Sequence, residues 1–107
     1  MLTSLQNPLV KQIRKLHSSK ERHKQGLFLL EGTHLLEEAS IQDYPLNIVC
    51  CTLQWQATHQ QLWQSVGEKC DRAEVVSEEV MKALATTMQP DGVVATAKRG
   101  HYVAELG

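Results

Sequence analysis

The chain has 107 residues, 42% of them hydrophobic, and a formal net charge of −1. This size suits one compact domain with a modest core and leaves no room for a second. No apolar run approaches the roughly 20 residues of a membrane span, and no charged-then-apolar signal pattern opens the chain, so we expect a soluble, cytoplasmic protein without a membrane partner.

The near-neutral total hides a strong charge asymmetry. Up to Lys24 the chain carries six Lys and Arg residues against one acid, Glu21, whereas the rest carries five against eleven. We call residues 7–24 the basic head; its charge is 6 − 1 = +5, and that of the remaining body is 5 − 11 = −6. Binding responds to the local field more than to net charge, so this asymmetry favours a polyanionic partner such as nucleic acid.

The basic head begins with a predicted amphipathic helix. Asn7 is a favoured N-cap, and proline suits the first helical position that follows it. At about 100° per residue, apolar and basic side chains separate onto two faces. The apolar face consists of Leu9, Val10, Ile13 and Leu16, and the basic face of Lys11, Arg14 and Lys15. We therefore expect the apolar face to dock on the core.

The rest of the chain alternates short apolar strands with helices. Residues 18–26 lack apolar periodicity, which predicts a loop or a short frayed helical turn. Strands are expected at residues 27–30, 47–53, 74–76 and from 93, and helices at 33–42, 58–66 and after Ser77, with Thr33 as a cap. This alternation predicts an α/β fold, a three-layer sandwich with a small, mostly parallel or mixed sheet of about four strands between helices.

Three cysteines indicate no disulfide framework, because their number is odd and Cys50 and Cys51 would point to opposite faces of a strand. A zinc site from one of these with His59 and Cys70 is conceivable, but no metal-ligand spacing supports it. Buried thiols are the stronger interpretation. Motifs for nucleotide binding, metal hydrolysis and nucleophilic catalysis are also absent, so we assign no catalytic, cofactor or metal residues.

The candidate site is therefore a surface for RNA. A basic helix face is often only solvated, but here the cations continue past the helix with almost no compensating acid. The predicted phosphate contacts are Lys11, Arg14, Lys15, Lys20, Arg22 and Lys24. Aromatic residues are few, so base stacking should be secondary.

Three further residues are candidates for this site, and each also has a purely structural explanation. Asn7 could be only a cap. Glu31 could be only a strand-end acid, or a carboxylate that orients an arginine such as Arg22. His34 follows a strand at the edge where α/β sheets often bind ligands, although an exposed first-turn histidine is the more common case.

Several short motifs, in this order and spacing, resemble a known family. They are Ser4-x-x-Asn7-Pro8-x-x-Lys11, Lys20-x-Arg22, Gly26-x-Phe28, Leu30-Glu31-Gly32, Glu38-Ala39, Val76-Ser77, Val80, Leu84, Thr87 and Pro90-Asp91-Gly92-Val93. Over roughly residues 2–97 the chain resembles the amino-terminal module of SpoU/TrmH-type RNA ribose 2′-O-methyltransferases of the SPOUT superfamily. Asp91 stands where that pattern has glutamine.

The resemblance implies a substrate-binding domain for rRNA or tRNA, at residues 1–97, with a fold like that of RNA-binding ribosomal proteins. It further implies that S-adenosylmethionine is bound by a following knotted, typically dimeric catalytic domain, toward which residues 98–107 would start a linker. The chain alone would then be inactive. Two alternatives stay open: a stand-alone RNA-binding protein of the ribosomal-protein type, and a module that docks a catalytic domain or a dimer mate.

Overall fold

The computed structural model describes residues 1–98, and its four strands form one mixed sheet in the order β1-β4-β2-β3. The strands are β1 (Leu27–Glu31), β2 (Leu46–Cys51), β3 (Arg72–Val75) and β4 (Val93–Lys98). Strand β4 runs antiparallel to both β1 and β2, while β2 and β3 are parallel. This arrangement confirms the predicted small mixed sheet.

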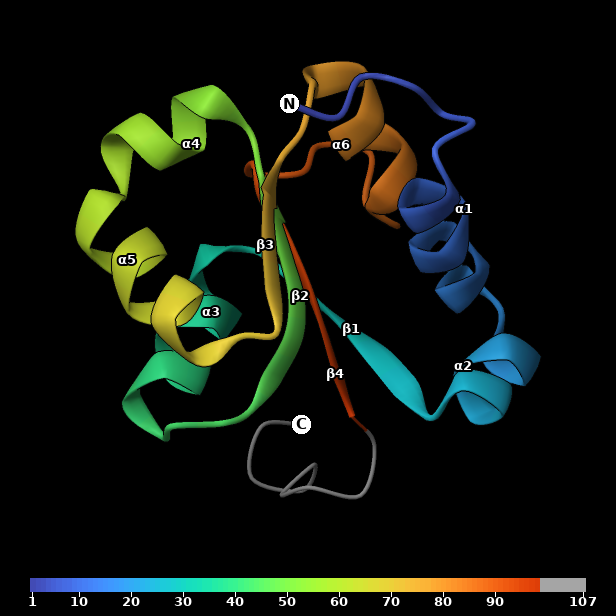
Figure 1. Ribbon diagram of the computed structural model, residues 1–107, viewed down its shortest axis with the longest axis horizontal. Helices are drawn as coiled ribbons and strands as arrows, with labels where there is room; N and C mark the ends of the chain where they lie inside the picture. Colours follow the sequence, from blue (N-terminus) through green and yellow to red (C-terminus); the bar gives the residue numbers. More distant parts are fainter. Residues whose placement is uncertain (99–107) are drawn as a thin grey trace.

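Helices cover both faces of this sheet, which Figure 1 shows edge-on in the centre of the molecule. One layer holds α3 (Thr33–Ile41), α4 (Leu53–Thr58) and α5 (Gln60–Lys69). The other holds α1 (Pro8–Arg14), the 3-10 turn η1 (Lys15–His17), α2 (Ser19–Gln25) and α6 (Glu78–Leu84). The three-layer sandwich is therefore confirmed.

The strand period of two divides the core into two clusters, one on each side of the sheet. Cys51 belongs to the cluster under α3 and α5, with Leu36 and Trp55, whereas Cys50 belongs to the cluster under α1 and α6, with Ile13. The adjacent cysteines thus point to opposite faces, as predicted. The first helix docks by its apolar stripe, since Leu9, Val10, Ile13 and Leu16 are all buried.

Two helix predictions were wrong in their limits. Strand β2 ends at Cys51 and not at residue 53, because Thr52 caps α4, its hydroxyl accepting from the Trp55 N–H at 3.2 Å. Helix α4 was therefore not predicted, and the predicted helix 58–66 corresponds to α5. Residues 18–26, predicted as a loop or a frayed turn, contain the helix α2. The expected linker lies outside the described residues from position 99 on.

The start of α3 also differs from the prediction. Thr33 is the first helical residue and not the cap; Gly32 occupies the cap position with φ of 103°, a backbone conformation that glycine adopts readily. The Thr33 hydroxyl therefore does not cap the helix and contacts Asp91 and Trp55 instead.

Candidate nucleic-acid interface

Helix α1 presents its basic face to solvent because its N-terminus and its apolar face are both fixed. The Asn7 side-chain oxygen accepts from the Leu9 N–H at 2.8 Å and from the Val10 N–H at 3.4 Å, so Asn7 is an N-cap. Lys11, Arg14 and Lys15 are all exposed. The predicted amphipathic helix is confirmed in this respect.

Helix α2 lies against α1 without burying any of its own residues. It begins at the Ser18 cap and ends at Gly26, whose φ of 69° is left-handed. Polar contacts hold it in place: the Arg22 guanidinium donates to the Leu16 carbonyl at 2.9 Å, and the Gln25 amide donates to the Gln12 carbonyl at 3.4 Å. The absence of an apolar stripe explains why periodicity alone did not predict this helix.

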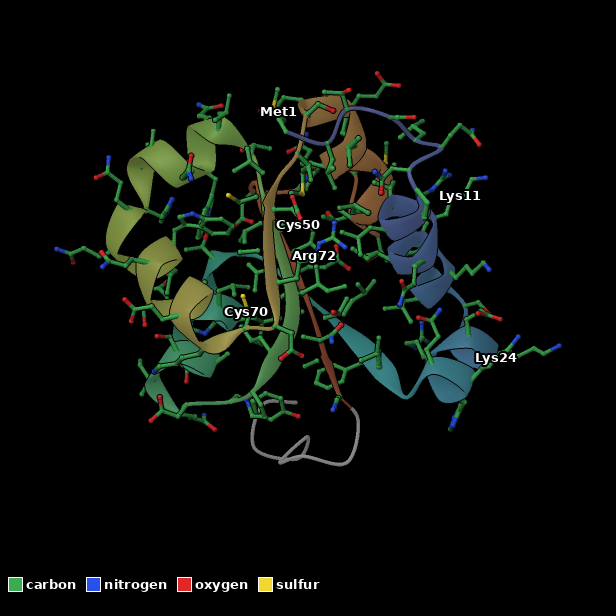
Figure 2. All side chains as sticks on the ribbon, viewed as in Figure 1. Met1, Lys11, Lys24, Cys50, Cys70 and Arg72 are labelled. Carbon is green, nitrogen blue, oxygen red and sulfur yellow. The ribbon has the colours of Figure 1, made fainter. Side chains whose placement is uncertain are left out.

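A depression of about 470 Å³ lies between these two helices, and we call it the basic groove. Three lysines reach it, Lys11 from α1, Lys15 from η1 and Lys24 from α2, beside one acid, Glu21. The remaining lining residues are Pro8, Gln12 and Gln25. Figure 2 shows Lys11 and Lys24 projecting to the same side of the molecule, away from the sheet. Flexible ammonium groups around a concave surface can each contact a phosphate.

The cations of the basic head form no ion pair with any residue in the described range 1–98. The cations of the acidic body differ: Lys69 pairs with Asp43, and Arg72 pairs with Glu74 at 2.7 Å. The positive potential of the head is therefore not neutralised locally, whereas that of Lys69 and Arg72 is. This contrast makes the two paired cations suitable controls.

Not every predicted contact lies at the groove. Lys20 is exposed on α2 but does not line the depression, and neither does Arg14. Arg22 is half-buried, and its contact with the Leu16 carbonyl gives it a structural role. The idea that Glu31 orients Arg22 finds no contact in the structure, because the Glu31 carboxylate instead accepts from the N–H and the hydroxyl of Thr86.

Glu31 and His34 belong to the other end of the sheet. Glu31 ends β1 and lines a separate depression of about 260 Å³ with Gln89 and Asp91. His34 is exposed in the first turn of α3, in the helical layer opposite α1. The structure therefore does not bring these two residues together with the lysines of the basic groove.

The same end of the sheet carries a hydrogen-bonded cluster that sequence reasoning missed. The Thr33 hydroxyl donates to Asp91 at 2.8 Å and accepts from the Trp55 indole N–H at 2.9 Å, while the Thr33 N–H also donates to Asp91 at 2.8 Å. The His59 ring stacks on Trp55 with centroids 4.6 Å apart. In the sequence Asp91 stood out only as a departure from the motif of the resembling family, and no local signal links it to Thr33, 58 residues away.

The thiols are structural. Cys50 and Cys51 are buried, and burial raises the pKa of each to about 12, which keeps them protonated at neutral pH. Within residues 1–98 no group of histidine, cysteine or carboxylate side chains is arranged to hold a metal ion. In the same range every helix is too short or too polar to cross a membrane.

The α/β fold with its basic helical layer matches a known class of domain. Residues 7–95 match the family model for the MRM3-like substrate binding domain, and the chain belongs to this family. An uncharacterized tRNA/rRNA methyltransferase of Synechocystis sp. (strain ATCC 27184 / PCC 6803 / Kazusa) is 48% identical over 95 residues, which are 89% of this chain and 35% of that protein.

Two solved structures share the fold. AdoMet-bound rRNA methyltransferase from Sinorhizobium meliloti has a TM-score of 0.75 and 26% identity, covering 91% of this chain and 35% of that one. A structure described as an RNA 2′-O ribose methyltransferase has a TM-score of 0.71 and 28% identity, covering 91% of this chain and 36% of that one. The chain thus spans about a third of the length of these relatives.

Proposed function

We propose that this chain is the RNA-binding, substrate-recognition domain of an S-adenosylmethionine-dependent RNA 2′-O-ribose methyltransferase that acts on rRNA or tRNA. The observation that carries the proposal is the basic groove, where Lys11, Lys15 and Lys24 surround one depression without ion pairs inside the described range. Family membership supports a substrate-binding role, and the names of the relatives supply the substrate class.

The chemistry of the parent enzyme belongs to a further domain in this proposal. Residues 1–97 recognise RNA, residues 98–107 begin a linker, and a catalytic domain binds S-adenosylmethionine as part of a cytoplasmic homodimer. The partial coverage of the relatives supports a parent longer than this chain. The chain alone should not bind the cofactor. Calorimetry with S-adenosylmethionine tests this, and saturable binding at micromolar cofactor would overturn it.

RNA binding is tested by the salt dependence of affinity, because phosphate contacts release counterions. If four or so cations meet phosphates, the slope of log affinity against log salt is about −3 for a single-stranded RNA. We would measure anisotropy of a labelled mixed-sequence RNA of about 20 nucleotides, long enough to exceed one binding site. Changing Lys11, Lys15 and Lys24 together to glutamine should flatten the slope by about two units.

The matched control changes Lys69 and Arg72 to glutamine. Each of these cations already faces a carboxylate, and both belong to the acidic body, so the control should leave affinity and slope nearly unchanged. Different RNA sequences should weaken alike in the groove variant, since phosphate contacts do not read bases. If the two variants changed RNA affinity and salt slope equally, the groove would be excluded as the binding surface. If the unchanged chain did not bind RNA, the proposed function would be refuted.

A further inference from the structure

The two edge strands of the sheet are protected very differently. The outer edge of β3 is covered at its C-terminal end by Leu2 of the N-terminal segment: the Leu2 N–H donates to the Val75 carbonyl, and the Ser77 N–H donates to the Leu2 carbonyl, both at 2.9 Å. The edge also carries the charged pair Arg72 and Glu74. Coverage and edge charges are two devices by which proteins prevent strands from pairing with other chains.

The outer edge of β1 has no such cover within residues 1–98, and its one charged residue is Glu31 at the end of the strand, whose carboxylate accepts from Thr86. The Gly32 N–H donates to the Val93 carbonyl at 3.1 Å. In an antiparallel pair every second residue directs its backbone N–H and carbonyl toward the neighbouring strand, so Leu30 and Phe28 also direct theirs toward β4. The N–H and carbonyl groups of Leu27, Leu29 and Glu31 therefore point outward. None of these outward groups has a hydrogen-bond partner within residues 1–98.

The sequence of this strand does not blunt the edge. Residues 27–31 read Leu-Phe-Leu-Leu-Glu, without lysine or proline, and the pairing with β4 continues without a bulge. Phe28 and Leu29 are only half-buried, so apolar side chains accompany the free backbone groups. A regular, apolar strand with unpaired backbone groups is a template for another strand.

We propose that β1 pairs with β1 of a second copy of this chain, antiparallel and centred on Leu29. Such a two-fold arrangement is self-complementary, because each outward residue faces an outward residue: Leu29 faces Leu29, and Leu27 faces Glu31. Each of these facing pairs can exchange two hydrogen bonds. The two sheets join into one continuous sheet. The backbone pairing itself involves β1 and not the basic groove.

Charge complementarity favours a second copy over an unrelated strand. In the two-fold arrangement the acidic end of one strand, Glu31, lies at the Leu27 end of the other. The last turn of α2, with Arg22, His23 and Lys24, immediately precedes that end. Glu31, whose carboxylate accepts from Thr86, thus lies at the end of the partner strand that is nearest to basic residues. In a parallel arrangement that placed Glu31 beside Glu31, the two carboxylates would repel each other.

The contact is short, so the dimer should be weak and concentration-dependent. Amide hydrogen exchange of the whole chain, followed by NMR, tests it without a substitution. Between about 20 µM and about 1 mM chain, protection of the Leu29 N–H should rise severalfold by mass action. The N–H groups of Phe28 and Leu30, bonded to β4, should be protected equally at both concentrations. A Leu29 N–H that exchanges equally fast at both concentrations overturns the proposal.

A pair of variants provides the second measurement. Leu29→Lys places two ammonium groups opposite each other in the dimer. Leu29 is half-buried against the core cluster beneath α1 and α6, so in the monomer the flexible lysine stem stays there while its ammonium group extends to solvent. Leu53→Lys, at a 57% exposed leucine of α4, is the control. In sedimentation experiments the dimer dissociation constant of Leu29→Lys should be at least about tenfold higher than that of the control, since like charges oppose pairing. Equal association of the two variants, with circular dichroism confirming the fold of each, contradicts the pairing.

Discussion

Gly92 lies at the point where the loop after α6 enters β4, and among the glycines of residues 1–98 it leaves the least space for a side chain. Its φ is 105°, and a Cβ there would lie 2.9 Å from the Cβ of Trp55 and 3.1 Å from the Thr52 hydroxyl oxygen. Both neighbours are buried, and Thr52 caps α4. Gly92→Ala therefore combines backbone strain with a collision that no flexible side chain can relieve.

The expected cost follows from these two contributions. A left-handed backbone costs an alanine about 1–2 kcal/mol, and overpacking a well-filled site costs about 1–3 kcal/mol, so Gly92→Ala should destabilise the chain by about 2–5 kcal/mol. Urea denaturation followed by circular dichroism measures this change, provided that the slope stays constant. Trp55 fluorescence should change as well, because the collision is with that side chain.

Two other glycines separate the contributions. Gly26 has φ of 69° with nothing within 4 Å of a new Cβ, so Gly26→Ala should cost only the strain, about 1 kcal/mol. Gly67 lies inside α5 with open space around it, so Gly67→Ala should stabilise the chain by about 0.5–1 kcal/mol. If Gly92→Ala lowered the free energy of unfolding no more than Gly26→Ala does, the inferred collision with Trp55 would be refuted.

Two further predictions concern groups outside the groove. Arg22→Ala should destabilise the chain by about 1–2 kcal/mol, because it leaves the Leu16 carbonyl without its charged donor, whereas exposed Lys20→Ala should stay within about 0.5 kcal/mol in the same urea assay. The pKa of Cys50 and of Cys51 is raised from 9.0 to about 12 in the fold, so the thiols ionise first in the unfolded chain. The free energy of unfolding should not change below pH 9 and should fall above it, by up to about 1.4 kcal/mol per pH unit for each thiol. A variant with both cysteines changed to alanine should lose that part of the pH dependence. An identical decline in both proteins would contradict the prediction.

Helices were predictable where one face is buried, and the strands β2 and β4 where an apolar run is buried on both faces. The stripe of α1 and the opposite facing of Cys50 and Cys51 follow from the periods of a helix and a strand. Helix α2 failed this criterion because it buries nothing, although Ser18 followed by Glu21 at the third position and Gly26 at the end are cap signals that would have indicated it. Cap chemistry was thus more informative than periodicity for this surface helix.

The candidate site was predictable in its charge but not in its geometry. Lysines on separate helices could be assigned to one head from composition, but their meeting around one groove depends on how α2 turns back against α1. The polar contacts of Arg22 and Gln25 set that turn, and no local pattern encodes such contacts between helices. For the same reason Thr33 and Asp91, 58 residues apart, escaped detection.

In the basic head, the side chains that are buried in the core and the cations proposed to bind RNA belong to the same short segment. On α1 the buried stripe docks the helix, and the lysines occupy the opposite side with no core contact. On α2 no residue is buried, so the placement of its cations depends on a few hydrogen bonds at its edges. Such a helix opens at lower free energy than the core, because few buried contacts oppose its opening. A phosphate backbone lying in the groove would contact both helices at once and would therefore hold α2 against α1, so RNA binding and the order of α2 should reinforce each other.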